Sequence, residues 1–317
     1  MNFMNSYYER IIRLACNSLR SYIGYMPVTF ALIIGVFIIS WSSIIIRLMG
    51  DVDPMIISFY RLSISAIILM PLWKNTDFKK IHWHSSGKLM LLAGFFLALH
   101  FYTWITSLQL TTVGNSIFLE STHPLFGLLF SVLFLKEKPG LRFIPVIFLG
   151  LSGMFIIVFR DINLDPDLLS GDLYAVAGAI FVAAYLIAAR KTGKNIPLIP
   201  YLTLVYGIAA VFLLIAMLLK NICFWSLPLQ TWLWLLLLAL GPSFIGHSIL
   251  NWASRKIPVY YVNTALLSEA VLATVFAALI LQEIPGFNFY IGAVLIIIAV
   301  IRIFRQRKVN EINTLKG

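Results

Sequence analysis

Long apolar runs separated by short polar connections are the main pattern of this chain. The runs are about 17 to 23 residues long, enough at about 1.5 Å per residue for a helix to cross a hydrocarbon core of roughly 30 Å. Proline or glycine marks many of the connections, and no soluble domain fits between the runs. The pattern predicts ten membrane-spanning helices, at residues 28 to 48, 54 to 73, 87 to 108, 113 to 135, 143 to 160, 171 to 190, 198 to 219, 232 to 252, 260 to 281 and 286 to 304.

One apolar segment and the turn after it occur twice, as HPLFGLLFSVLFLKEKPGLRF at residues 123 to 143 and EAVLATVFAALILQEIPGFNF at residues 269 to 289. The copies pair without a gap and align Glu137 with Glu283 and Pro139 with Pro285. Each half of the chain is therefore interpreted as one structural repeat. Because each half holds an odd number of spans, the second half must cross in the opposite sense. We expect inverted repeats, an arrangement common in secondary transporters.

Composition and charge agree with a membrane protein. Hydrophobic residues make up 60% of the chain and charged residues only 12%. The net charge of +11 would suit a nucleic-acid-binding surface, but the 24 Lys and Arg residues segregate. Nearly all fall in alternate connections and in the two tails, while the opposite side holds only Arg47, Arg160 and Lys220. The positive-inside rule then places both termini in the cytoplasm, with membrane lipids and no nucleic acid as partners.

The expected organisation is an all-α, multi-pass protein of a bacterial-type cytoplasmic (inner) membrane. Residues 1–27 form a cytoplasmic segment, either an interfacial basic helix or a partly ordered tail. Two five-span repeats follow at 28–160 and 171–306, joined by an outer linker at 161–170. A cytoplasmic tail at 307–317 ends the chain.

Several common chemistries leave no signature in the chain. Cys16 and Cys223 fall on opposite sides of the predicted membrane, so they cannot form a disulfide. The motifs of ATP-driven pumps, zinc proteases and serine hydrolases are missing from the sequence. His82 and His84 have a metal-like spacing but lie in a basic connection with few other ligands. We therefore expect no metal and no cofactor, and energy from gradients.

Three short stretches accompany the paired repeats: LHFYTWITSL at 99 to 108, Pro-Leu-Phe at 124 to 126, and GHSILNWASR at 246 to 255. Together with the loop Glu and Pro of each repeat, they resemble the EamA-type, ten-span branch of the drug/metabolite transporter superfamily over residues 28 to 306. Two features differ from the family's pattern. The residue before the loop Glu is often Gly there but is Lys136 or Gln282 here. Ala270 follows Glu269 where the family often has proline, which leaves the bend of that span open.

The resemblance implies a transporter that moves a small organic molecule through a central cavity by alternating access. The substrate classes it suggests begin with amino acids and related zwitterions, followed by organic cations. An importer of a cofactor-type metabolite such as S-adenosylmethionine is the alternative. A membrane-embedded enzyme is a remote alternative, because no loop concentrates catalytic polar residues. Monomer and homodimer both stay open.

Few ionisable residues lie at membrane depth, where a charge is costly and usually functional. Glu120 and His123 are one helical turn apart in the fourth span. Glu269 lies near the middle of the ninth span, with Asn263 closer to the cytoplasm. We expect all four to bind substrate, and Glu120, His123 and Glu269 also to exchange protons. The alternative for Glu120 is a position near the hydrated headgroups or a pair with Arg61, and for His123 and Glu269 it is a structural hydrogen bond to another span.

Further candidates for the cavity wall are rings: two histidines and two tryptophans at roughly matching places of the repeats, and two more aromatics at helical spacing. They could bind a cation or relay protons, with helix packing as the alternative. These substrate-binding candidates are His100, His247, Trp104, Trp252, Tyr60 and Trp41.

Other residues are assigned structural roles. Arg61, the lone base inside a span, is expected to pair with Glu120, although a substrate carboxylate is the alternative partner. Small residues such as Gly153 and Gly292 should permit close helix packing. The loop acids should cap the helices that follow them. The structural residues of the two loops are Glu137, Glu283, Pro139 and Pro285.

Overall fold

The computed structural model describes residues 28–75, 83–159, 165–193, 196–223, 225–280, 282 and 285–316, and its regular elements there are all helices. Predictions about the N-terminal segment, Cys16, His82, Arg160 and Glu283 fall outside these residues. The helices are α2 (Val28–Ile39), α3 (Trp41–Met49), α4 (Pro54–Leu69), η1 (Met70–Asn75), α5 (Trp83–Leu110), α6 (Val113–Glu120), α7 (His123–Leu135), α8 (Phe143–Val158), η3 (Pro166–Leu168), α9 (Leu169–Thr192), α10 (Leu198–Leu219), α11 (Leu229–Leu238), η4 (Ala239–His247), α12 (Ser248–Ser254), α13 (Val259–Leu266), α14 (Ser268–Ile280) and α15 (Phe287–Lys316).

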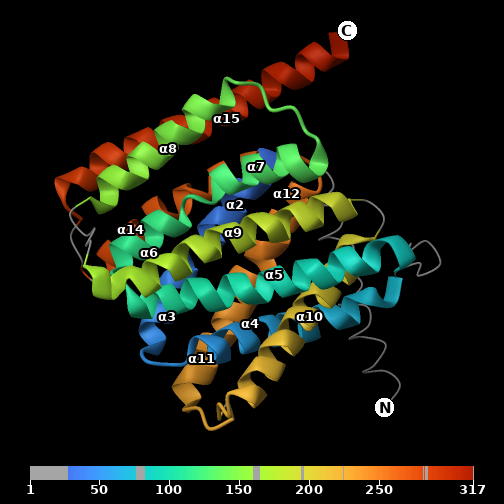
Figure 1. Cartoon of the computed structure of the whole chain (residues 1–317), viewed down its shortest axis with the longest axis vertical. Coiled ribbons are helices and arrows are strands. Elements are labelled where there is room, and N and C mark those ends of the chain that lie inside the picture. The colour runs from blue at the N-terminus through green and yellow to red at the C-terminus, as the bar shows by residue number, and fades with distance from the viewer. Residues whose placement is uncertain are drawn as a thin grey trace, which may run out of the picture.

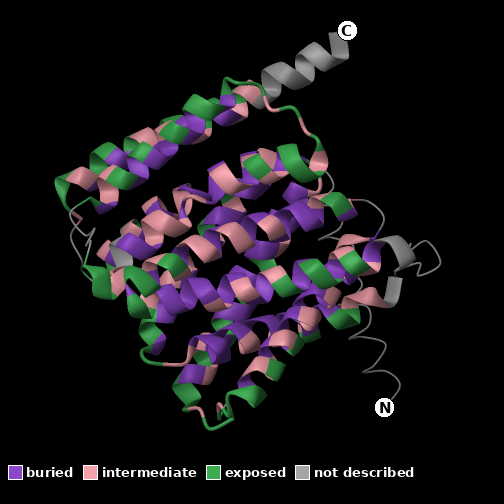
Figure 2. Ribbon diagram, viewed as in Figure 1, coloured by how far each residue is buried: buried purple, intermediate pink, exposed green. Residues whose placement is uncertain are grey.

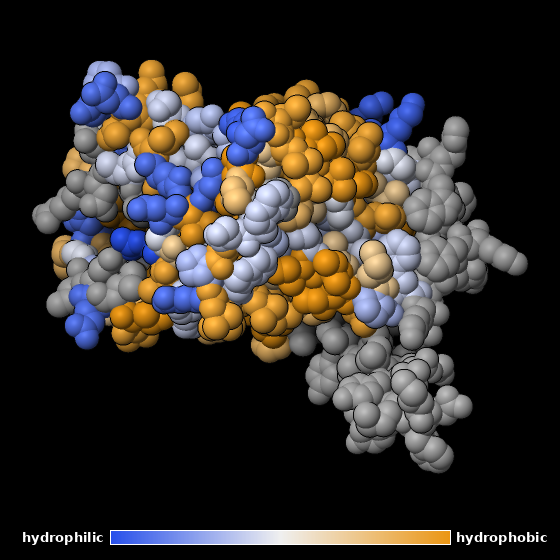
Figure 3. Space-filling model, turned by 90° about the horizontal axis from the view of Figure 1, so that it is seen from below, coloured by the Kyte–Doolittle hydropathy of each residue, from blue (hydrophilic) through white to orange (hydrophobic). Residues whose placement is uncertain are grey.

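All ten predicted spans are helical. Nine are long and apolar enough to cross a membrane within the described part of the chain, and α8, with 16 residues, is a shorter apolar helix. In Figure 1 the spans lie roughly parallel to one axis, and the connections gather at its two ends. Hydrophobic residues occupy much of the middle of the surface, whereas hydrophilic residues gather toward the ends (Figure 3). This distribution is that of a multi-pass integral membrane protein.

The two halves of the chain pack in a reciprocal pattern. The third span, α5, lies along α9, the sixth, and the matching pair of α2 with the eighth span (η4 and α12) also packs together. The second and seventh spans, α4 and α10, pack on each other, as do the fifth and tenth, α8 and α15. Exchanging the halves therefore reproduces the contacts, which is the pattern of a pseudo-two-fold axis.

Buried residues concentrate between the central helices, while the outer faces of α8, α10 and α15 are largely exposed (Figure 2). Small residues allow the closest approaches. A Cβ atom at Gly153 of α8 would lie 2.6 Å from the carbonyl oxygen of Gly292 on α15, and the reciprocal Cβ would meet Gly153 O. Backbone approach at this distance needs glycine on both helices, as expected from the sequence.

Four spans are interrupted near their centres within the described residues. The first changes at Ser40, the fourth at residues 121–122, and the ninth at Leu267, while the eighth passes through the π-helix η4. In the fourth span, Pro124 lacks an N–H and cannot extend the α-helical ladder. The ninth span has no proline there, yet the Leu267 amide turns back to the Thr264 carbonyl at 3.3 Å. Ala270 stands where proline was expected from the resemblance, so the sequence did not decide whether the ninth span is interrupted. The structure shows the interruption.

Side chains from neighbouring helices satisfy the backbone groups around η4. Pro242 lies inside this segment. The Ser65 hydroxyl donates to the Ala239 carbonyl at 3.0 Å, and the Tyr206 hydroxyl donates to the Ser243 carbonyl at 3.2 Å. Such partners are required because no water is present in the hydrocarbon core to replace them. The span predicted over 232 to 252 is confirmed, and the structure adds a π-helical segment around Pro242 that the prediction did not specify.

Lys136 and Gln282 have the left-handed backbone conformation at equivalent points of the two repeats. Their φ angles are 55° and 57°. Lys136 ends α7 while the Glu137 amide donates back to the Ser131 carbonyl at 3.1 Å, as in a helix C-cap that normally carries glycine. The glycine that the family often has at this position would adopt this conformation without strain. Lys136 and Gln282 adopt it at a cost in free energy.

We predict that Lys136→Gly and Gln282→Gly each raise the free energy of unfolding by about 1 kcal/mol, because glycine adopts positive φ without the Cβ clash. Thermal unfolding of the purified protein in detergent measures the change. Lys138→Gly, which lies two residues further and lacks the positive φ, serves as the control and should give no gain. Equal effects at 136 and 138 would contradict the explanation.

We also predict that Gly153→Ala lowers the free energy of unfolding by about 1 to 3 kcal/mol, because the added methyl group overpacks the contact between α8 and α15. Gly207→Ala is a matched helical control, since a Cβ there meets nothing within 4 Å. Chemical or thermal unfolding of both variants compares them. A Gly153→Ala protein as stable as the control would show that the close approach is absent in solution.

Candidate functional site

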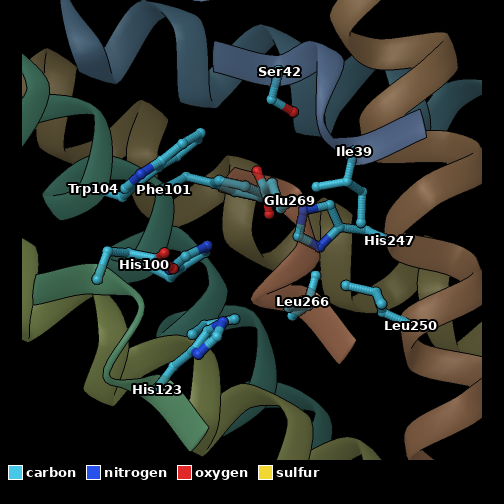
Figure 4. A pocket seen from close by; sticks show the side chains of 12 residues that line it. Ile39, Ser42, His100, Phe101, Trp104, His123, His247, Leu250, Leu266 and Glu269 are labelled. Atoms are coloured by element: carbon cyan, nitrogen blue, oxygen red, sulfur yellow. The ribbon is translucent and has the colours of Figure 1, made fainter. Parts of the chain in front are cut away.

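A cavity lies where the interrupted spans meet (Figure 4). It is lined by Ile39, Ser42, His100, Phe101, Trp104, Glu120, His123, Val182, His247, Leu250, Leu266 and Glu269. A neighbouring compartment shares five of these residues and adds Ser43, Ile117, Ser121, Ala270 and Ala273. The cavity and its neighbour each have a volume of about 30 Å³, which is room for water rather than for a metabolite.

The helix breaks explain why the acidic side chains face this cavity. Glu120 is the last residue of α6, His123 is the first of α7, and Glu269 lies in the first turn of α14. His123 and Glu269 are equivalent positions in the two sequence repeats, so the same bend presents a base in one half and an acid in the other. Both carboxylates are half-buried and line the same cavity. The predicted Glu120, His123 and Glu269 are thus brought together.

Three histidines surround the carboxylates. His100 Nδ1 lies 3.0 Å from the Gly178 carbonyl, which can only accept, so Nδ1 carries a proton and Nε2 is the acceptor of the neutral ring. The His100 ring lies parallel to Trp104, with centroids 6.2 Å apart. In His123 and His247, Nδ1 is buried without a hydrogen-bond partner. Such orphaned nitrogens beside a cavity are available to water, a proton or a ligand.

Four residues predicted to bind substrate do not line the cavity. Trp41 stacks on Phe276 with ring centroids 4.5 Å apart, and Tyr60 packs against Trp232 at the same distance. Trp252 is covered by Lys256, whose Nζ lies 4.2 Å from the ring centroid. Their spacing in the sequence correctly predicted that they lie on helices. Packing against other side chains directs their rings away from the cavity.

Asn263 is the fourth of these residues, and it supports the cavity from behind. Its side-chain amide donates to the His123 carbonyl at 3.1 Å and lies against Gly127. The bond satisfies a backbone group at the break between α6 and α7 and links the two repeats. Asn263 therefore positions His123 instead of lining the wall.

The predicted ion pair between Arg61 and Glu120 is wrong. Arg61 Nε donates to the Ser243 hydroxyl at 2.9 Å, and neither Nη1 nor Nη2 has a partner. The guanidinium carbon instead lies 3.8 Å from the centroid of the Phe101 ring. This cation–π contact compensates part of the cost of burying the charge.

Sequence reasoning missed part of the cavity wall. Phe101 and Ser42 line the cavity and Ser43 lines the neighbouring compartment, together with apolar residues from six further helices. The hydroxyls of Ser40, Ser42 and Ser43, close together near the middle of the first span, were a usable signal, since polar groups at this depth need a partner. The apolar residues of the wall gave no such signal, because the sequence does not distinguish an apolar residue that faces a cavity from one that faces lipid.

Polar contacts close both ends of the central helices. At the end predicted to be outside, Asp172 accepts from the side chains of Thr111 (2.5 Å) and Asn115 (2.9 Å) and so ties α9 to the corner between α5 and α6. At the other end Arg190 donates to Glu137 at 2.7 and 2.8 Å. Glu137 therefore anchors α9, instead of capping the following helix as predicted.

Arg255 adds a second contact at this end. Its guanidinium donates to the backbone carbonyls of Gly193 and Ile196 and lies over the Tyr201 ring. Desolvation by burial lowers the pKa of Arg255 from its ordinary value, although the neighbouring Tyr201 opposes this effect. The contacts hold the connection after α9 against the end of α12.

The described residues contain no group of three or more His, Cys, Asp or Glu side chains that could hold a metal ion. The cavity presents two carboxylates, three imidazoles and an aromatic wall. This set can bind a positively charged group and exchange protons.

Comparison with known proteins shows what the chain is similar to. The model of the family described as "EamA-like transporter family" matches residues 26–159 and 169–305. No curated protein matches the sequence significantly. A crystal structure described only as "Crystal structure of protein" has a TM-score of 0.73 and 17% sequence identity, with 86% of this chain and 95% of that chain covered, and at this identity it supports the fold alone. Because two copies of the family model together cover most of the sequence, the chain belongs to the EamA-like transporter family.

Proposed function

We propose that the protein is a secondary active transporter that moves a small organic metabolite, an amino acid or a related zwitterion or organic cation, across the cytoplasmic (inner) membrane. Transport proceeds by alternating access and is coupled to protons. One observation carries the proposal: His123 and Glu269 occupy equivalent helix breaks in the two repeats and face the same cavity.

The proposed topology has inverted repeats and both termini in the cytoplasm. The distribution of Lys and Arg supports this orientation. The reciprocal packing of the two halves, with α5 on α9 and α2 on the eighth span, supports a two-fold relation between five-span units. A site between such units can open to either side as one unit rocks against the other.

The small cavity and the contacts at both ends support an alternating mechanism. A metabolite needs several times more room than about 30 Å³, so substrate entry requires the helices to separate. The Asp172 contacts would break on one side, and the Glu137–Arg190 and Arg255 contacts on the other. Opening both ends together would leave a leak, which alternate opening avoids.

The cavity wall supports a substrate with an ammonium or similar cation. Glu120 and Glu269 can accept its hydrogen bonds, and the ring of Trp104 adds a cation–π surface. Two carboxylates in one small cavity repel each other, so binding of a proton by one of them is favoured in the absence of a cationic substrate. Exchange of that proton for the substrate would couple proton movement across the membrane to substrate transport.

We predict that Cys223 reacts with a membrane-impermeant maleimide in intact cells, because it is exposed at the end proposed to be outside. The Cys16→Ser variant isolates this reaction. The Cys223→Ser variant, which keeps only Cys16, should react only after permeabilisation. Labelling of Cys16 from outside, with protection of Cys223, would reverse the proposed orientation.

We predict that Glu269→Gln and Glu120→Gln each slow transport about tenfold or more, because a neutral amide replaces a charge-assisted hydrogen bond. Proteoliposomes that contain a pool of amino acids and organic amines, read by mass spectrometry, measure the flux. Asp51→Asn, on an exposed acid away from the cavity, is the control. Unchanged flux in both Glu variants would contradict the assignment of these residues to the substrate site.

The flux assay also separates the competing classes of function. Movement of intact compounds across the vesicle membrane supports a transporter. A new product without net flux would instead favour a membrane-embedded enzyme, and flux of S-adenosylmethionine alone would favour the cofactor importer.

A further inference from the structure

Arg61 is an unusual residue for the interior of a membrane protein. Its side chain is fully buried, with 0% exposure, and its Nη1 and Nη2 atoms have no hydrogen-bond partner. A buried cation without an anion is unfavourable and is normally paired. The Nε bond to Ser243 and the contact with Phe101 offset part of this cost, but neither of them uses the two Nη donors.

The guanidinium lies one side chain behind the cavity wall. Its carbon atom is 3.8 Å from the centroid of the Phe101 ring, and Phe101 itself lines the cavity. The same ring lies next to His100 and His247, with centroids 4.9 and 5.0 Å apart, and both histidines also line the cavity. Movement of a single aromatic side chain would therefore connect the guanidinium with the space beside Glu269.

The anchoring of Arg61 leaves free the atoms that a carboxylate needs. Nε is held by the Ser243 hydroxyl at 2.9 Å, and Ser243 belongs to the π-helix η4. The two Nη atoms remain, and adjacent guanidinium donors bind a carboxylate in a planar, two-point geometry. A lysine could not present this fork, and an internal ion pair would have used it.

We propose that Arg61 is the carboxylate-binding subsite of the cavity, covered by Phe101 in this conformation and exposed when that ring swings aside. The inference rests on the proposed transport function and narrows its substrate to a zwitterion. The substrate's ammonium group binds Glu120 and Glu269, and its carboxylate binds Arg61. Arg61 contacts one face of Phe101, and Phe101 lines the same small cavity as Glu120 and Glu269, so the two subsites lie on one cavity wall. A purely cationic substrate would leave the guanidinium unpaired.

Thermal unfolding of the purified full-length chain with three matched probe mixtures tests the subsite. The mixtures are the standard amino acids, their methyl esters, which lack the carboxylate charge, and their N-acetyl derivatives, which lack the ammonium charge. We expect the free amino acids to raise the melting temperature at concentrations about tenfold or more below those of the esters. This comparison within the wild-type protein needs no variant to fold.

Two variants then assign the preference to one residue. Arg61→Gln should bring the response to amino acids down to that of the esters while the response to the esters stays unchanged. Phe101→Leu, which removes the aromatic cover, should strengthen the response to the N-acetyl derivatives. Arg302→Gln removes an exposed arginine on α15 and should change none of the responses.

Equal responses to amino acids and esters in the wild-type protein would overturn the subsite. A preference for the free carboxylate that survives in Arg61→Gln would overturn it as well, because another group would then bind the carboxylate. Flux of amines or esters in proteoliposomes, without any preference for amino acids, would leave the transporter proposal intact and remove only the Arg61 inference. Absence of any response to all three mixtures would exclude zwitterions as the substrate class and with them this subsite.

Discussion

Backbone hydrogen bonding inside the hydrocarbon core is the constraint on which this architecture depends. Each amide and carbonyl must find a partner within the protein, so interruptions of a spanning helix are tolerated only where other helices supply one. The interruptions here meet that condition: Ser65 and Tyr206 serve the carbonyls of η4, and Asn263 serves the carbonyl of His123. The cavity lies among these breaks because broken helix ends and their polar partners gather there.

Duplication gives the two halves the same bends with different chemistry. The fourth span breaks beside Pro124, whereas the ninth breaks without a proline, so the geometry belongs to the packed repeat and not to one residue. At this shared bend, one repeat presents His123 and the other Glu269. The left-handed caps at Lys136 and Gln282 show the same principle: the fold retains a conformation that neither side chain favours.

Charge balance links the buried groups into one system. Two half-buried carboxylates, three histidines and Arg61 lie in or next to the cavity, yet Arg61 contacts the face of Phe101 and pairs with neither acid. An internal pair would neutralise the groups and lower the cost of burial. Keeping them apart leaves charges that a substrate or a proton can satisfy, which is a state of higher energy but one that responds to a ligand.

The sequence was enough to predict the spans, because the length and apolarity of each run depend only on local composition. It also identified Glu120, His123 and Glu269 as residues at membrane depth, since few ionisable groups occur there. Which rings face the cavity depends on packing between helices: Trp104 faces it, while Trp252, predicted to be its match in the other repeat, lies under Lys256. Tertiary structure likewise decided that Arg61 contacts Phe101 instead of Glu120, and that the eighth span contains a π-helix. These outcomes depend on rotation about helix axes and on contacts between distant segments, and helical periodicity leaves both undetermined.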